Sequence, residues 1–218
     1  MSLSPSPSKK QLTQAKIVML GGCGVGKSAF VVRYITKRYI GDYENNKEMV
    51  YTHKVNSPRG DDITLEIVDT ASQTSSADLE NHIKSGDGFV MMYSVTDRNS
   101  FCTICRLKET LYQHKPVEIP LVLVANKSDI LTARSVTEDE GTALAADLDC
   151  PKYEISVADS PQGVLESMDE LLRQILREHV KSLTRLPVHQ AESNKKSKLL
   201  NMKNALKKRI GRSRSDTF

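Results

Sequence analysis

A glycine-rich stretch decides the fold of this chain: Gly21-Gly22-Cys23-Gly24-Val25-Gly26-Lys27-Ser28. It fits the spacing G-x-x-x-x-G-K-[ST], with an apolar run over residues 17–20 before it and a helix-like segment over residues 29–35 after it. Glycines let backbone N–H groups turn inward around a phosphate, and a helix N-terminus adds the positive end of its dipole. Lys27 can then reach the β- and γ-phosphates, and the Ser28 hydroxyl can ligate Mg²⁺. A glycine-rich turn that binds nothing is the alternative, and the strand–loop–helix context argues against it.

Outward from this phosphate loop, residues 21–28, the chain alternates between strands and helices. Strands are predicted at residues 15–20, 51–56, 63–69, 88–95, 121–125 and 151–156, and helices at residues 29–36, 77–84, 99–114, 137–148 and 163–183. Asn99 or Ser100 is expected to cap the third helix, and Thr137 with Glu140 forms a capping box for the fourth. The predicted fold class is α/β: a P-loop NTPase with a doubly wound, mostly parallel six-stranded sheet, one antiparallel edge strand and five flanking helices.

Length and charge suggest three parts. The 218 residues suffice for one full domain and an extension. Residues 1–14 are predicted to be disordered, residues 15–183 to form the domain, and residues 184–218 to be a basic, largely disordered tail. From residue 181 onward eleven Lys and Arg oppose two acids, a net charge of +9, so the total of +4 leaves −5 for residues 1–180.

Targeting signals are not visible in the sequence. No apolar run approaches the ~20 residues that span a bilayer, and the Ser/Pro-rich start lacks the apolar core of a secretory signal. The four cysteines have no disulfide-framework spacing, which favours reduced thiols. We therefore expect an intracellular protein without a transmembrane segment.

Three polar segments follow strand ends and are expected on one rim of the sheet, where ligands bind in doubly wound folds. Asp69 ends its strand and can hold Mg²⁺ through water. Asn126-Lys127-Ser128-Asp129 follows a buried strand; the Asp129 carboxylate can accept two parallel hydrogen bonds from N1–H and N2–H₂ of guanine, a donor pair that adenine lacks. Ser156 and Val157 follow the last strand, and the Val157 N–H can meet guanine O6.

Together these motifs resemble the Ras superfamily of small GTPases over roughly residues 15–182, and residues 31–44 are most similar to its RERG-like branch, in particular to the Ras-like family-eleven proteins. The resemblance implies a signalling switch that binds GTP or GDP with Mg²⁺ and hydrolyses GTP. It implies that Tyr39 edges the base, Tyr43 closes over the phosphates, and Gln73 orients the attacking water. Gln73 and Lys27 are the expected catalytic residues. The nucleotide-binding set is Gly21, Gly22, Cys23, Gly24, Val25, Gly26, Lys27, Ser28, Ala29, Tyr39, Tyr43, Asn126, Lys127, Asp129, Ser156 and Val157, and the Mg²⁺ set is Ser28, Asp69 and Asn46.

Four residues depart from the family pattern. Asn46 stands where the family has a Mg²⁺-ligating Thr, and Ser72 stands where it has the Gly whose N–H bonds the γ-phosphate. Cys23 stands at a position that is usually Gly and crowds the space that Gln73 would use. Ala158 replaces a Lys beside the base. The pattern predicts slow GTP hydrolysis.

Two other functions remain as alternatives. A pseudo-GTPase would be a folded interaction module that holds nucleotide constitutively, or none. An ATP-using phosphotransferase is disfavoured because Asn126 and Asp129 suit guanine.

The tail is a basic amphipathic segment in which Leu199, Met202, Leu206 and Ile210 recur at helical spacing among the cations of residues 195–214. An anionic membrane surface, nucleic acid or nuclear import, a calmodulin-like partner, and a solvated tail all fit this pattern. The final residues carry no prenylatable cysteine. The resemblance favours the nucleus or nucleolus, with the cytoplasm as the alternative, and a monomer with unidentified effector and regulatory proteins.

Overall fold

The computed structural model describes residues 11–41, 47–56, 60, 62–71, 74–115 and 118–185, without the side chain of Arg185. Contacts divide the chain into two units, residues 1–178 and 179–218, and the sheet lies in the first. Tyr43, Asn46, Ser72 and Gln73 lie outside the described residues, as do most of both termini. The predictions for these residues, and for the domain bounds, therefore stay predictions.

The described residues form a single mixed sheet with helices on both sides. Its strands are β1 (Gln14–Gly21), β2 (Met49–Asn56), β3 (Asp62–Asp69), β4 (Gly88–Ser94), β5 (Leu121–Asn126) and β6 (Lys152–Glu154). The helices are α1 (Lys27–Thr36), α2 (Ser76–Ser85), α3 (Arg98–His114), α4 (Glu138–Asp147) and α5 (Gln162–Arg185), with a 3₁₀ turn, η1 (Leu131–Ala133), that the sequence did not predict.

The strand order is β2-β3-β1-β4-β5-β6, and among these described strands only β2 and β3 pair antiparallel. This confirms the predicted fold class. Every residue of β4 and β5 is buried, as continuous apolar strands covered on both faces should be. The edge strand β2 instead alternates between half-buried and exposed residues from Tyr51 to Asn56.

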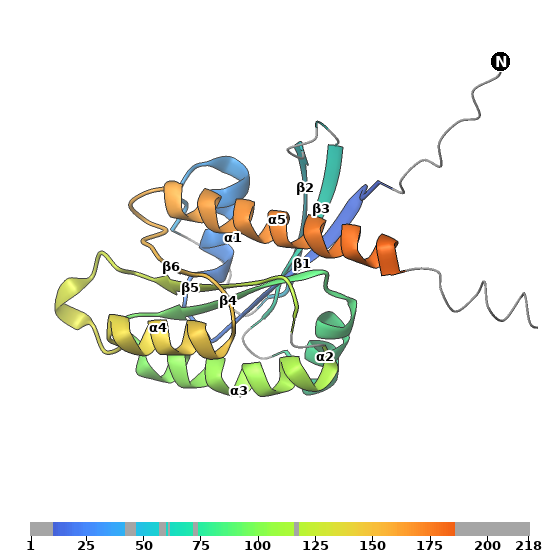
Figure 1. The fold of residues 1–218 in the computed structure, drawn as a ribbon. Coiled ribbons are helices and arrows are strands. Elements are labelled where there is room, and N and C mark those ends of the chain that lie inside the picture. Colours follow the sequence, from blue (N-terminus) through green and yellow to red (C-terminus); the bar gives the residue numbers. More distant parts are fainter. Residues whose placement is uncertain are drawn as a thin grey trace, which may run out of the picture. The chain divides into compact units, whose positions relative to one another are not determined.

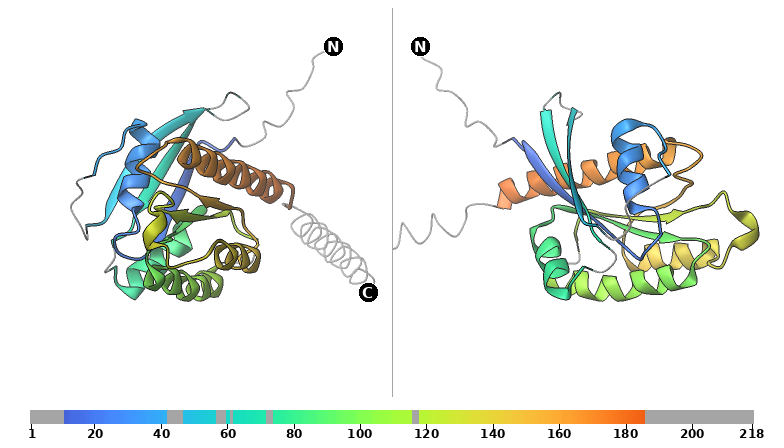
Figure 2. Two further views of the ribbon diagram at one scale, coloured as in Figure 1. Left: turned by 90° about the vertical axis from the view of Figure 1, so that its left-hand side faces the viewer. Right: turned by 180° about the vertical axis from the view of Figure 1, so that it is seen from behind.

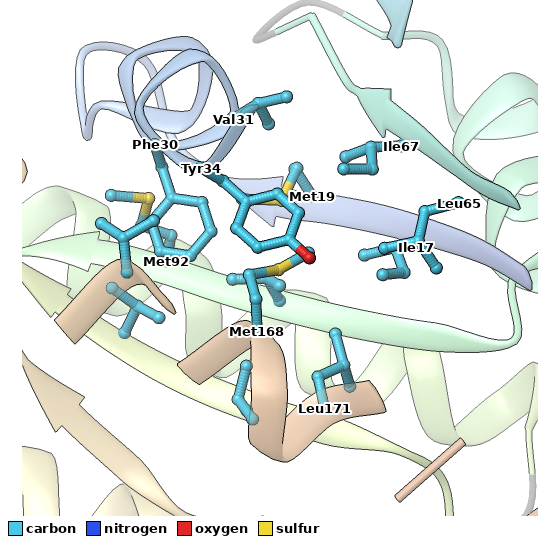
Figure 3. Packing of buried hydrophobic residues seen from close by; sticks show 14 of the residues in the cluster. Ile17, Met19, Phe30, Val31, Tyr34, Leu65, Ile67, Met92, Met168 and Leu171 are labelled. Carbon is cyan, nitrogen blue, oxygen red and sulfur yellow. The ribbon is translucent and has the colours of Figure 1, made fainter. Parts of the chain in front are cut away.

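Helices α1 and α5 cover one face of the sheet, and α2, α3 and α4 cover the other (Figures 1 and 2). Figure 3 shows the first core, in which Phe30 of α1, Met19 and Ile17 of β1 and Met168 of α5 belong to one cluster of buried side chains. Burying a side chain as large as Phe30 stabilises the fold by about 1.5–3 kcal/mol. The second core packs α2, α3 and α4 against the opposite face, around residues such as Leu111.

Helix capping was predicted correctly at α4 and incorrectly at α3. The Thr137 side chain accepts the Glu140 N–H, and the Glu140 carboxylate accepts the Thr137 N–H, which confirms the capping box. At α3 the cap is Asp97, whose carboxylate accepts the Asn99 N–H at 2.9 Å. Ser100 lies inside the helix, where its buried hydroxyl accepts the Ser94 N–H. Among the described residues, no helix combines the length and apolar character needed to cross a membrane.

Candidate functional site

A cavity of about 380 Å³ opens beyond the carboxyl ends of β1, β3, β5 and β6. Its volume falls within the ~300–1,000 Å³ typical of small-molecule sites. The lining comes from segments far apart in the chain: Cys23, Gly24, Val25, Gly26, Lys27, Ser28, Ala29, Tyr39, Gly41, Lys47, Thr70, Ala71, Asn126, Lys127, Asp129, Ile130, Ser156, Val157 and Ala158. The fold thus brings the phosphate loop and the segment after β5 to the same cavity.

Three glycines of the phosphate loop have positive φ angles; Gly21, at 159°, is close to extended, and Gly24 and Gly26 are the two in the left-handed region. Gly24 has φ 68°, and a Cβ there would meet nothing within 4 Å, so the backbone conformation alone favours glycine. Gly26 has φ 101°, and its Cβ would lie 2.5 Å from the Asn126 side-chain nitrogen, so both conformation and space demand glycine. Gly26 caps α1 without a side-chain hydrogen bond, which leaves the first N–H groups of the helix to a ligand or water.

Lys27 is the first residue of α1 and is 6% exposed. Its Nζ donates to the carbonyl oxygens of Gly21 and Gly22, each at 2.9 Å. Burial lowers the pKa of Lys27, and the nearby charge of Asp69 opposes that shift. The ammonium group is therefore held at the cavity wall by two neutral acceptors, an arrangement from which it can also reach an anionic ligand.

Ser28 and Asp69 place two hard oxygen groups side by side. The Ser28 hydroxyl donates to Asp69 Oδ2 at 2.5 Å. The parallel register of β1 and β3 pairs Asp69 with Met19 and so sets where Asp69 lies along the sheet. Asp69 is 2% exposed; burial raises the pKa of its carboxyl, opposed by the Ser28 hydrogen bond and the Lys27 charge. This donor pair fits Mg²⁺. The described part of the chain holds no cluster of three or more His, Cys, Asp or Glu side chains suited to a metal, so nucleotide oxygens, water and Asn46, which lies outside the described residues, would have to supply the other Mg²⁺ ligands.

We expect Asp69→Asn to raise the melting temperature of the nucleotide-free protein at neutral pH by about 2–4 °C, for a gain of about 1 kcal/mol. Because burial raises the pKa of Asp69 in the folded chain, the ionised carboxylate destabilises the fold at neutral pH. That penalty is lost as the pH falls through the raised pKa, so the gain should vanish by about pH 4, the ordinary Asp range. Thermal unfolding across pH measures it. Asp62→Asn, an exposed position at the start of β3, is the control, and an Asp69→Asn gain that persists at low pH would contradict the explanation.

Asn126 links three parts of the site. It ends β5 and is 3% exposed. Its amide nitrogen donates to the Val25 carbonyl at 2.8 Å, and its amide oxygen accepts the Val157 N–H at 3.0 Å. One buried side chain therefore joins the phosphate loop to the β6–α5 loop, residues 155–161, with both of its polar groups bonded.

The segment after β5 turns sharply toward the cavity. Lys127 adopts a left-handed conformation with φ 67°, and the Ser128 N–H donates to the Ile155 carbonyl at 3.2 Å. Asp129 is exposed and lines the cavity. Its carboxylate therefore borders the same space as the phosphate loop. The Val157 N–H, expected to meet guanine O6, is here donated to Asn126, so it would contact a base only by sharing or exchanging that bond.

Most residues of the predicted site line the cavity. Gly21 and Gly22 do not, and contribute carbonyls to Lys27 instead; Asp69 reaches the site through Ser28. The lining residues missing from the predicted set are Gly41, Lys47, Thr70, Ala71, Ile130 and Ala158. Thr70 and Ala71 directly follow Asp69, so their position in the sequence could have predicted that they line the cavity. The Thr70 hydroxyl is bonded within the fold, because it donates to the Met19 carbonyl at 2.7 Å. Lys47 and Ile130 carry no motif.

Comparison with known proteins agrees with this geometry. The family model "Ras family" matches residues 16–177. The chain is 36% identical to the Ras-related and estrogen-regulated growth inhibitor of Bos taurus, over 90% of this chain and 95% of that protein. It is 41% identical to Ras-like protein family member 11B of Danio rerio, over 72% of this chain and 67% of that protein. It is 38% identical to the Ras-related and estrogen-regulated growth inhibitor-like protein of Bos taurus, over 76% of this chain and 84% of that protein. Both groups named by the sequence resemblance are thus among the relatives, and the chain belongs to the Ras family.

Proposed function

We propose that this protein is a guanine nucleotide-dependent switch that binds GTP and GDP with Mg²⁺ and hydrolyses GTP slowly. One observation carries the proposal: a single cavity is lined by the phosphate loop and by Asn126, Lys127 and Asp129, and Asn126 bonds the two sides together. Membership of the Ras family supports guanine nucleotide binding in general.

Each half of the cavity has a distinct proposed task. The N–H groups of residues 22–28 and the ammonium group of Lys27 would hold the phosphates. The Asp129 carboxylate would select guanine, while the Lys127 stem and Tyr39 would cover the base. Ser28 would ligate Mg²⁺, with Asp69 behind it; when bound, the ion neutralises charge on the phosphate oxygens. Tyr43, Asn46 and Gln73 would complete the site.

Slow hydrolysis is proposed because the γ-phosphate end differs from the family pattern. Cys23 is exposed and lines the cavity, at the position where the family usually has glycine. Asn46 and Ser72 replace two more family residues in segments outside the described ones. Because phosphoryl transfer depends on positioning and electrostatics, such changes slow cleavage without preventing binding.

We expect Cys23→Gly to speed single-turnover GTP hydrolysis by about tenfold, which corresponds to about 1.4 kcal/mol of barrier. The substitution removes the side chain that occupies space beside the γ-phosphate. Cys23 has no positive φ, so glycine is tolerated without being required. Cys23→Ala should give an intermediate rate, and Cys102→Ala, an exposed thiol on α3, should leave the rate unchanged. Equal rates for Cys23→Gly and wild type would contradict steric crowding.

Calorimetric titration with GTP, GDP and ATP, with and without Mg²⁺, tests the proposed function. Tight binding of both guanine nucleotides, strengthened by Mg²⁺ and not matched by ATP, is the expected result. Chromatography of the nucleotide that copurifies with the protein then distinguishes turnover from a stalled site. GDP supports turnover, GTP supports a stalled site, and no bound nucleotide supports the pseudo-GTPase interaction module. Equal competition by ATP overturns guanine recognition.

A further inference from the structure

Arg33 is a buried cation outside the cavity lining. It lies on α1, and only 8% of its surface is exposed. Its Nη2 donates to the backbone carbonyl of Asp159 at 3.2 Å, and its buried Nε has no hydrogen-bond partner among the described residues. A guanidinium stays charged at any physiological pH, and burying it with so few partners is unfavourable. An aliphatic residue at this buried position of an amphipathic helix would avoid the free-energy cost of burying a charge, so we expect the arginine to have a specific role.

The carbonyl that Arg33 holds belongs to the β6–α5 loop. Residues 156–158 of this loop line the cavity, and Asp159 follows them directly. The Asp159 N–H donates to the Ser156 hydroxyl at 3.1 Å, which closes the loop into a compact turn. A displacement at Asp159 therefore moves the residues that face the cavity.

The β6–α5 loop is thus held at two points, both of which lead back to the phosphate-binding segment. At Val157 the link runs through Asn126 to the Val25 carbonyl of the phosphate loop. At Asp159 it runs through Arg33 to α1, the helix that begins with Lys27. The two links differ in chemistry, since one is a neutral amide and the other a charged donor. Together they fix the distance between the groups proposed to hold the phosphates and the backbone proposed to meet the purine.

We infer that Arg33 is a positioning residue for purine recognition: from α1 it sets the β6–α5 loop so that the backbone of residues 157 and 158 stands opposite O6 of the bound guanine. This inference rests on the proposed function. It assigns no contact between Arg33 and the nucleotide. A mere structural link would lower stability and weaken all nucleotides alike, whereas a positioning role weakens the contact to O6 selectively.

The test compares two nucleotides that differ only at O6. GDP carries an oxygen there and 6-thioguanosine diphosphate a sulfur, a much weaker acceptor, while N1–H and N2–H₂ are unchanged. Dissociation of each from the full-length protein is followed by displacement with excess GDP. For Arg33→Met we expect GDP to dissociate about five- to tenfold faster than from wild type, and the thio analogue less than twofold faster.

Lys115→Met is the matched control. Like Arg33, Lys115 is a long cation that donates to backbone carbonyls, those of Lys84 in the last turn of α2 at 3.0 Å and of Gly86, the C-cap of α2, at 2.8 Å, and neither acceptor residue lines the cavity. The Lys115→Met variant should leave the dissociation rates of both nucleotides within twofold of wild type. Arg33→Lys keeps one charged donor and should restore part of the GDP rate.

The outcomes separate this inference from the proposed function. If wild type binds neither GDP nor GTP, the proposed function fails and the inference with it. If wild type binds GDP, and Arg33→Met speeds the dissociation of both nucleotides equally or of neither, only the inference is overturned. Melting temperatures with and without GDP show whether Arg33→Met is folded. If it is not folded, the dissociation rates of the two nucleotides are compared on Arg33→Lys instead. Equally faster dissociation of both nucleotides from Arg33→Lys overturns the inference.

Discussion

Asn126→Ala is expected to raise the dissociation constant for GDP by at least a hundredfold. The alanine leaves the Val25 carbonyl and the Val157 N–H without the partner that each has now. An unsatisfied buried polar group costs about 1–3 kcal/mol, so two of them give about 2–6 kcal/mol, which exceeds a hundredfold over most of that range. The effect falls on nucleotide binding because both orphaned groups border the cavity.

Titration calorimetry with GDP measures this change. Asn99→Ala, an exposed position in the first turn of α3, is the control and should bind GDP as wild type does. Circular dichroism shows whether Asn126→Ala is folded at the temperature of the titration. A folded Asn126→Ala protein with wild-type affinity would mean that the loops keep their positions without this side chain.

The second large effect is a change of base preference in Asp129→Asn. Aspartate offers two acceptors, which match N1–H and N2–H₂ of guanine; asparagine offers one acceptor and one donor, which match N1–H and O2 of xanthine. We expect GDP affinity to fall about a hundredfold, since each hydrogen bond to a charged group contributes about 1.5–3 kcal/mol. Xanthosine diphosphate should bind the variant more tightly than GDP does.

Competition between the two diphosphates gives the ratio directly. Asp159→Asn removes an exposed carboxylate from the neighbouring loop, so it controls for the loss of one negative charge near the cavity, and it leaves the backbone carbonyl that Arg33 holds. Should Asp129→Asn still prefer GDP over xanthosine diphosphate, base recognition would have to come from other groups.

The sequence was a good guide to the fold because the signals for its elements are local. Fully apolar strands such as β4, with the phosphate loop after β1, leave few alternatives to a doubly wound parallel sheet. The error at α3 is equally local: Asp97, Asn99 and Ser100 all have side chains that can cap, and only the geometry selects Asp97. The 3₁₀ turn η1 was missed because three residues show no period.

The site was predictable where a short motif encodes it and unpredictable where tertiary structure creates it. The phosphate loop and the segment from Asn126 to Asp129 have fixed spacings, so the sequence could point to them as segments that line one cavity. Lys47 and Ile130 enter the cavity lining only because of how their loops run. Arg33 could not be found at all, since its partner Asp159 is 126 residues away and nothing in a helical pattern marks one arginine as buried.

The two hydrogen bonds of the Asn126 side chain bear on nucleotide exchange. Asn126 lies at the end of β5 and holds each loop through a separate atom, so one loop can part from it while the other stays bonded. A shift of Asn126 itself would loosen both loops at once, on both sides of the cavity. A protein that accelerated nucleotide exchange could therefore act on the end of β5 and reach both loops together.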